Sequence, residues 1–172
     1  NLCPEVTIED IIGEMRAACC ELAKIGRPLG MSGHSAGGHL AACMLATDWR
    51  AIDPSLPGKL VTAAYSISGL FDLKPLVGTS VNNALHLDEA SARAASPLFW
   101  EPLSRGSLDA VVGEKESAEY LRQSKTIAAS WGAAGLQTRF DTIAGANHFT
   151  AIAPLVDPAS AMVRRLRELA GR

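Results

Sequence analysis

Apolar residues near the start of the chain recur at the spacing of a helix face. Between Thr7 and Ile25 they return every three or four positions, which is the period of an amphipathic helix. These residues are Ile8, Ile11, Ile12, Met15, Cys19, Leu22 and Ile25. Thr7 is a suitable N-cap with Asp10 at the third helical position, and Gly26 and Pro28 end the pattern. We therefore predict a helix over residues 7–25.

Strand and helix patterns alternate through most of the remaining chain. Short apolar runs predict strands over residues 28–32, 59–68, 108–112 and 137–143, and longer periodic stretches predict helices over 36–46, 117–131 and 158–170. Strands that alternate with helices pair in parallel, because each helix carries the chain back across the sheet. We therefore expect an α/β fold with a mostly parallel, doubly wound sheet flanked by helices.

One stretch has no clear period. Residues 73–105 contain three prolines and are expected to form short helices and loops. We expect this irregular insertion to cap the functional site of the domain. Within it, Leu85, Phe99 and Trp100 are candidates to line the site, although packing in the core is the simpler role for each. A length of 172 residues fits one domain, so we assign residues 1–172 to it.

Composition excludes several classes of protein. A hydrophobic fraction of 48% and a charged fraction of 20% are ordinary for a folded domain with a core, which excludes disorder. The net charge of −2 provides no basic surface for nucleic acid, and Arg164, Arg165 and Arg167 are interpreted as the solvated face of the last helix. No apolar run is long enough to span a bilayer, and we expect no signal peptide and no membrane association.

Cysteine usage bears on the compartment. The four cysteines, Cys3, Cys19, Cys20 and Cys43, include no C-x-x-C pair. Cys19 and Cys43 fall on apolar helix faces, where a free thiol packs as a small hydrophobic group. This usage is typical of a reducing compartment, so we expect a cytoplasmic protein without disulfides or a zinc site.

Gly33, Ser35 and Gly37 form a G-x-S-x-G motif, with His34 inside it, between a predicted strand and a predicted helix. A sharp turn of this kind strains the serine backbone and leaves its hydroxyl at the carboxyl end of the sheet, and a side chain at either glycine would collide. The N–H of Ala36 can then donate to a developing oxyanion. A glycine-rich turn without chemistry is one alternative, and a phosphate-binding loop is another, although no Lys-Ser/Thr pair follows. The placement favours Ser35 as a nucleophile.

A serine nucleophile requires a base, and the chain has four histidines. The side chain of His34 is expected to point away from that of Ser35. His39 lies on the following helix, where a structural role is more common, and His86 lies in the irregular stretch. His148 follows the last predicted strand, which matches the order of serine, acid and histidine in enzymes built on such a sheet. We therefore favour His148, against the alternative of a loop histidine without a role.

The acid is expected between the serine and the histidine, in a loop after a strand. Glu114 and Glu116 both lie in the loop after the third predicted strand, and the sequence pattern does not separate them. Asp109 lies at the wrong end of its strand, and Asp141 lies within the last strand. A carboxylate in the loop would accept a hydrogen bond from the histidine ring and stabilise its charged form.

Several segments together resemble one family. They are residues 2–8, the elbow at 33–40, residues 68–73 with 75–76, residues 82–85 through 96–98, the acid loop at 112–117 with 122–124, and the histidine loop at 145–149. The pairing of the acid loop with the Asn147-His148-Phe149 run is more specific than the elbow. On these residues the chain resembles the arylformamidase (kynurenine formamidase) branch of the α/β-hydrolases, close to the esterase and lipase group.

The resemblance implies a function and a set of site residues. It assigns Ser35 as nucleophile, His148 as base and Glu116, where relatives carry Asp or Glu, as acid. The family hydrolyses a small molecule, N-formyl-L-kynurenine, to kynurenine and formate in tryptophan breakdown, without a metal or an organic cofactor. A short-chain carboxylesterase and a non-catalytic binding module of hydrolase fold are the alternatives.

The chain departs from the family at its start. Relatives carry a further segment before Leu2, which includes a His-Gly-Gly loop with additional oxyanion donors and several strands of the sheet. We therefore expect the C-terminal portion of an α/β-hydrolase, weak or inactive alone, because losing an oxyanion donor costs about 10²–10³ in rate. An exposed sheet edge would favour association, for example as a homodimer.

Overall fold

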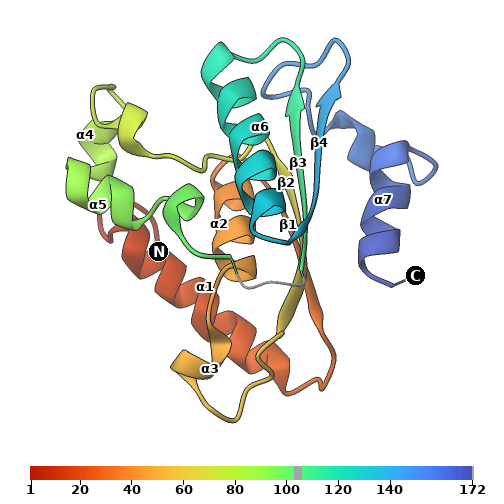
Figure 1. The fold of residues 1–172 in the computed structure, drawn as a ribbon. Coiled ribbons are helices and arrows are strands. Elements are labelled where there is room, and N and C mark those ends of the chain that lie inside the picture. Colours follow the sequence, from red (N-terminus) through yellow and green to blue (C-terminus); the bar gives the residue numbers. More distant parts are fainter. Residues whose placement is uncertain (103–105, 172) are drawn as a thin grey trace.

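The computed structural model describes residues 1–102 and 106–171, and a four-stranded sheet lies at its centre (Figure 1). The strands are β1 (Leu29–His34), β2 (Val61–Ile67), β3 (Ser107–Gly113) and β4 (Gln137–Ile143). They lie in the order β1-β2-β3-β4, and each neighbouring pair is parallel. The carboxyl ends of the strands therefore meet at one edge of the sheet, which is uppermost in Figure 1.

Helices cover both faces of this sheet. The longer ones are α1 (Ile8–Ala23), α2 (Ala36–Leu45), α6 (Ala118–Ala133) and α7 (Ala161–Leu169). Helix α2 packs on β1 and β2, α6 packs on β3 and β4, and α1 packs against α2. Helix α7 lies on the opposite face (Figure 1). The prediction of a parallel sheet flanked by helices is confirmed.

Within the described residues, the core consists of two apolar clusters, one on each face of the sheet. The larger cluster, on the α2 and α6 face, contains the fully buried Phe71 and Trp131. The smaller cluster lies under α7 and joins Tyr65 and Ile67 of β2 to Met162. β2 lies between β1 and β3 and is buried almost throughout, as expected for a central strand in a parallel sheet that is covered on both faces.

Capping residues decide where two of the predicted helices begin. Thr7 and Asp10 form the expected capping box at the start of α1, and the Asp10 N–H donates to Thr7 Oγ1 at 3.1 Å. Helix α7 begins at Ala161 rather than at 158. The Ser160 hydroxyl caps it by accepting from the Val163 N–H at 3.1 Å, which satisfies one of the first N–H groups of the helix.

The stretch predicted to be irregular consists of short helices and loops. The helices are η1 (Lys74–Leu76), α4 (Asn82–Leu85), α5 (Glu89–Ala94) and η2 (Pro97–Phe99). The stretch was predicted to run to 105, and its residues 103–105 lie outside the described part of the chain. Leu85 and Trp100 pack against the larger core cluster, whereas Phe99 is 44% exposed beneath the Arg93 guanidinium.

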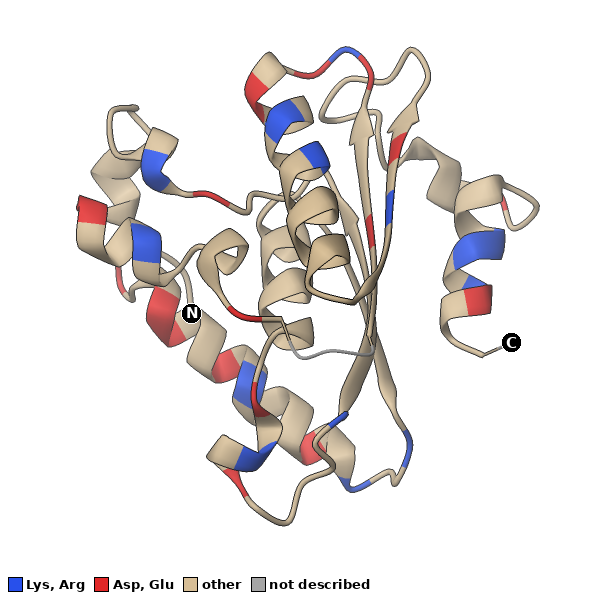
Figure 2. Cartoon of the chain, viewed as in Figure 1, with Lys and Arg blue, Asp and Glu red and all other residues tan. Residues whose placement is uncertain are grey.

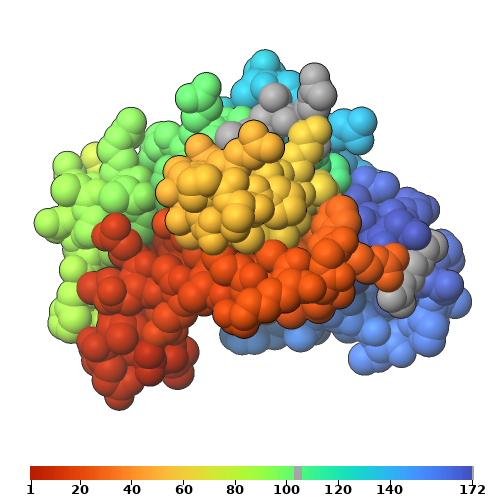
Figure 3. All heavy atoms as spheres, turned by 90° about the horizontal axis from the view of Figure 1, so that it is seen from below, coloured from red at the N-terminus to blue at the C-terminus, as the bar shows by residue number. Residues whose placement is uncertain are grey.

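Charged residues of both signs are dispersed over the helices, strands and loops (Figure 2). The end opposite the strand carboxyl termini is closed by α1 and by the segment around α3 (Trp49–Ile52), as Figure 3 shows from below. A remaining short helix, η3 (Ala153–Val156), precedes α7. Among the described residues, none of the helices has the length and apolar character that crossing a membrane requires.

Candidate active site

Ser35 is the single residue between the end of β1 and the start of α2. Its backbone is strained, with φ 56° and ψ −118°, a conformation that costs a non-glycine residue about 1–3 kcal/mol. Two backbone hydrogen bonds hold it there: the Ser35 N–H donates to the Ile67 carbonyl at 2.9 Å, and the His39 N–H donates to the Ser35 carbonyl at 3.0 Å. As the first residue of α2, Ala36 has an N–H without an acceptor inside the helix.

The two glycines of the elbow have different spatial requirements. A Cβ at Gly33 would lie 2.3 Å from the Gly37 carbonyl oxygen, so the turn excludes any side chain at Gly33. Among the described residues, a Cβ at Gly37 meets no atom within 4 Å apart from its chain neighbours and the backbone of its own helix, so the expectation that its side chain would collide across the turn is wrong. The close approach is made by the Gly37 backbone itself. Gly38 has the packing role instead, because its Cβ would lie 2.6 Å from Ser66 Oγ.

His148 lies in the loop after β4, and its ring reaches the elbow. His148 Nε2 lies 3.0 Å from Ser35 Oγ, and His148 Nδ1 lies 2.8 Å from Glu116 Oε2. The carboxylate can only accept, so Nδ1 carries the hydrogen and Nε2 is free to accept the serine proton. The Glu116 side chain is 1% exposed and that of His148 is 24% exposed. Serine, histidine and glutamate therefore form one continuous hydrogen-bonded chain.

The second oxygen of Glu116 is held by two further donors. Oε1 accepts from the Gly113 N–H at 2.7 Å and from the Ser68 hydroxyl at 2.5 Å. Ser68 directly follows β2, is fully buried and has a positive φ of 51°. Ser68 was not among the site residues predicted from the sequence. Its signal was a polar residue at the carboxyl end of a predicted strand, the same edge at which Ser35 lies.

The other candidate acids have different partners. Glu114 Oε2 accepts from the Gly145 N–H at 2.7 Å, which ties the acid loop to the loop after β4. Asp141 pairs with Arg139 at 2.8 Å within β4. Between Glu114 and Glu116, which the sequence pattern left open, the structure brings only Glu116 to His148.

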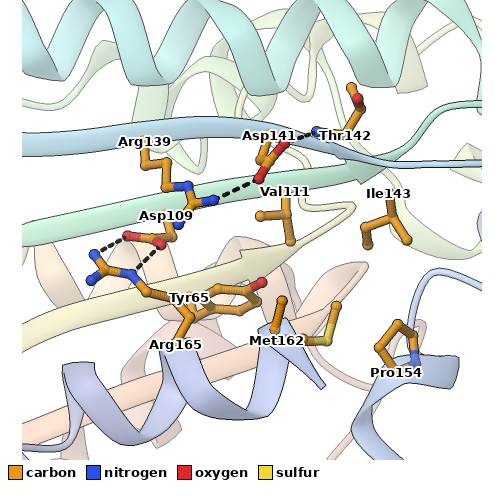
Figure 4. A pocket seen from close by; sticks show the side chains of 11 residues that line it. Tyr65, Asp109, Val111, Arg139, Asp141, Thr142, Ile143, Pro154, Met162 and Arg165 are labelled. Carbon is orange, nitrogen blue, oxygen red and sulfur yellow. Dashed lines mark hydrogen bonds and ion pairs between the residues drawn. The ribbon is translucent and has the colours of Figure 1, made fainter. Parts of the chain in front are cut away.

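Asp109 lies under α7, on the face of the sheet opposite α2 and α6, in the pocket of Figure 4. The Arg165 guanidinium forms a bidentate ion pair with the Asp109 carboxylate, with Nε 2.7 Å from Oδ2 and Nη2 3.0 Å from Oδ1. The interpretation of Arg165 as part of a solvated face is therefore wrong, because the buried Asp109 needs a cation beside it. Burial also raises the pKa of Tyr65, in the same pocket, to about 12.

Of the remaining histidines, His34 and His39 make contacts that support the structure around the site. His34 Nε2 donates to the His148 carbonyl at 2.8 Å, and the two rings lie 4.6 Å apart. His39 is buried, and its Nε2 lies 2.7 Å from the Ala95 carbonyl, which anchors the irregular stretch to α2. Burial lowers the pKa of His39. His86 takes a left-handed conformation, with φ 51°, at the end of α4.

Two aromatic side chains lie beside the His148 ring, and the exposed one, Phe149, is on its open side. The Tyr120 ring lies 4.8 Å from the His148 ring, and the Phe149 ring meets it edge-on at 5.7 Å. A pocket of about 300 Å³ has these three residues in its lining, together with Lys115, Glu116, Ser117 and Asn147. Phe149 is 82% exposed, so this side of the base is accessible from solvent.

The sequence is similar to those of curated kynurenine formamidases. The protein from Danio rerio is 34% identical over 147 residues, which cover 83% of the chain and 49% of that relative. The protein from Drosophila melanogaster is 29% identical, over 98% of the chain and 60% of the relative. The chain thus spans about half the length of the curated relatives it matches. No protein-family model matches it.

The fold is also similar to those of solved structures. A protein of Silicibacter sp., provisionally named a thioesterase, superposes with a TM-score of 0.78 and 34% identity, over 95% of the chain and 60% of that protein. An esterase from Thermogutta terrifontis superposes with a TM-score of 0.68 at 19% identity, over 97% of the chain and 64% of the esterase. The chain therefore has the fold of the α/β-hydrolases, and its sequence is similar to those of kynurenine formamidases.

Proposed function

We propose that the protein is a serine hydrolase that cleaves a formamide or ester bond through an acyl-enzyme, with Ser35 as nucleophile, His148 as base and Glu116 as acid. The observation that carries the proposal is the continuous hydrogen-bonded chain from Ser35 Oγ through the His148 ring to Glu116. A nucleophile, a base and a group that orients the base are the three parts that such chemistry requires.

In the first half of the proposed reaction, His148 Nε2 accepts the proton of Ser35 as Oγ bonds to the substrate carbonyl carbon. The carbonyl oxygen becomes an oxyanion, and the free N–H of Ala36 donates to it at the positive end of α2. Glu116 stabilises the imidazolium that forms. His148 then gives its proton to the leaving amine or alcohol, and the acyl group stays on Ser35.

In the second half, water enters on the open side of His148. The ring takes one proton from the water, whose oxygen attacks the acyl carbon and forms a second tetrahedral intermediate. The intermediate collapses, the Ser35 oxygen leaves and recovers the proton from His148, and the acid is released. For a formyl group this acid is formate.

The substrate we propose is N-formylkynurenine, because the curated relatives named above are kynurenine formamidases. The aromatic side chains beside His148 suit an aryl leaving group, since the leaving nitrogen must lie next to the ring that protonates it. A short-chain carboxylesterase is the second candidate, favoured by the fold shared with the esterase. Both activities are proposed for the complete protein.

The proposal extends to the cellular compartment and the association state of the protein. Cys3, Cys19, Cys20 and Cys43 are free thiols, which suits a reducing compartment such as the cytoplasm. β1 lies at one end of the strand order, so one of its edges can accept a further strand or a second copy of the chain.

A fluorophosphonate probe tests the nucleophile in the complete protein. The unmodified protein should be labelled at Ser35, and Ser35→Ala should abolish labelling. Ser32→Ala, on the exposed side of β1 three residues earlier, is the matched control and should be labelled normally. An unlabelled parent protein would favour the non-catalytic binding module.

Turnover of N-formylkynurenine against a short-chain nitrophenyl ester separates the two enzyme candidates.

A further inference from the structure

Ser68 is a buried hydroxyl that the reaction steps above do not use. We propose that Ser68 is a positioning residue, whose hydroxyl fixes the Glu116 carboxylate in the orientation that aligns His148 with Ser35. This inference rests on the proposed serine hydrolase function.

The hydrogen bonds of Glu116 divide between its two oxygens. Oε2 serves the His148 ring, while Oε1 receives the Ser68 hydroxyl and the Gly113 N–H. A carboxylate with donors on both oxygens cannot rotate without breaking at least one bond. The Glu116 side chain is 1% exposed, so solvent is poorly placed to replace a lost donor.

The backbone of Ser68 indicates that its position is held at a cost. A φ of 51° is unfavourable for a side chain with a Cβ, and glycine would adopt it freely. The conformation is fixed by the Ser68 N–H, which donates to the Val111 carbonyl at 2.7 Å. A strained serine, in place of a relaxed glycine, is explained if its hydroxyl has a function, and that hydroxyl reaches Glu116.

The orientation of the Glu116 carboxylate determines how the His148 ring is held, because neighbouring groups limit the other movements of the ring. His148 packs against His34 at 4.6 Å and against Tyr120 at 4.8 Å, so the ring is confined on two sides. Its remaining freedom is rotation about its own axis, which the Nδ1 bond to Glu116 restrains. Loosening Glu116 would therefore loosen the Nε2 that faces Ser35.

Ser66, two residues earlier and within β2, provides a matched control. Both hydroxyls are fully buried, but the Ser66 hydroxyl has no hydrogen-bond partner within the described part of the chain. Ser66→Ala and Ser68→Ala remove the same atom from neighbouring buried positions, and only Ser68→Ala removes a donor to Glu116. Ser68→Gly removes the hydroxyl and also relieves the backbone strain.

The test is the rate of Ser35 labelling by a fluorophosphonate in the complete protein, measured against pH, with urea unfolding of each variant. Ser68→Ala should slow labelling about 10-fold or more, since hydrogen bonds to charged groups are the stronger class. It should also shift the acid limb of the pH profile, because that limb depends on the contact between His148 and the carboxylate that the Ser68 hydroxyl holds in place. Ser68→Gly should be equally slow although more stable than Ser68→Ala, and Ser66→Ala should match the parent.

Two results would overturn the inference and are distinct from a failure of the proposed function. If the parent is labelled and Ser68→Ala keeps both its rate and its pH profile, the hydroxyl does not position Glu116. If Ser68→Ala loses stability alone, with rate and profile unchanged, its role is structural. A parent protein that is never labelled at Ser35 contradicts the proposed function itself.

Discussion

Replacing Gly33 by alanine should disable the elbow while leaving most of the fold in place. The new Cβ would lie 2.3 Å from the Gly37 oxygen and 2.4 Å from its carbon, both backbone atoms that cannot rotate away. Atoms of this kind are essentially never closer than 3.0 Å, so the turn must open by about 0.7 Å. Ser35 lies in the middle of that turn, and its hydroxyl is already 3.0 Å from His148 Nε2.

An opening of this size takes the serine beyond hydrogen-bond reach of the base. A misplacement of about 1 Å can cost roughly 10²-fold in rate, so Gly33→Ala should slow fluorophosphonate labelling of Ser35 by about that factor. Gly30→Ala, on the same strand, meets no atom of the described chain within 4 Å and serves as the control. Gly37→Ala should also label within a few-fold of the parent. Labelling of Gly33→Ala at the parent rate, with circular dichroism showing a folded protein, would refute the reasoning.

Three further predictions concern charged and titratable groups. Arg165→Leu leaves the Asp109 carboxylate buried without its cation and should lower the free energy of unfolding by about 3 kcal/mol in a urea titration, whereas a loss under about 1 kcal/mol would mean that the pair behaves as an exposed one. Because burial lowers the pKa of His39 below its ordinary 6.5, the unfolded chain binds a proton there before the folded chain does. Stability should therefore fall as the pH drops below about 6.5, and His39→Gln should weaken this dependence in urea titrations; equal dependence in both proteins would contradict the assignment. Glu116→Gln should reduce ester turnover by roughly 10³–10⁴-fold in the complete protein and Glu114→Gln by only a few-fold, and equal losses would contradict the geometry.

The sequence by itself determined the features that are written locally. The helix period and the capping residues Thr7 and Asp10 predicted α1, and alternation of strand and helix patterns predicted the parallel sheet. The G-x-S-x-G motif predicted the strand-to-helix turn at Ser35. The structure contains this turn, and the Ser35 backbone in it is strained. Each of these features depends on residues within a few positions of one another, which is the range over which a pattern carries information.

Other features were decided only by the tertiary structure. The choice between Glu114 and Glu116 depends on which carboxylate faces a histidine 32 residues further on. Arg165 was misjudged because its partner, Asp109, lies 56 residues away on another element.

The same physical reason explains why Ser68 was overlooked, since its contact with Glu116 spans 48 residues. Ser35 and His148 are 113 residues apart, and their approach follows from the order of the strands and not from either local pattern. Periodicity records which face of an element is buried. Which polar groups meet at the carboxyl edge of the sheet is set by how the strands are assembled.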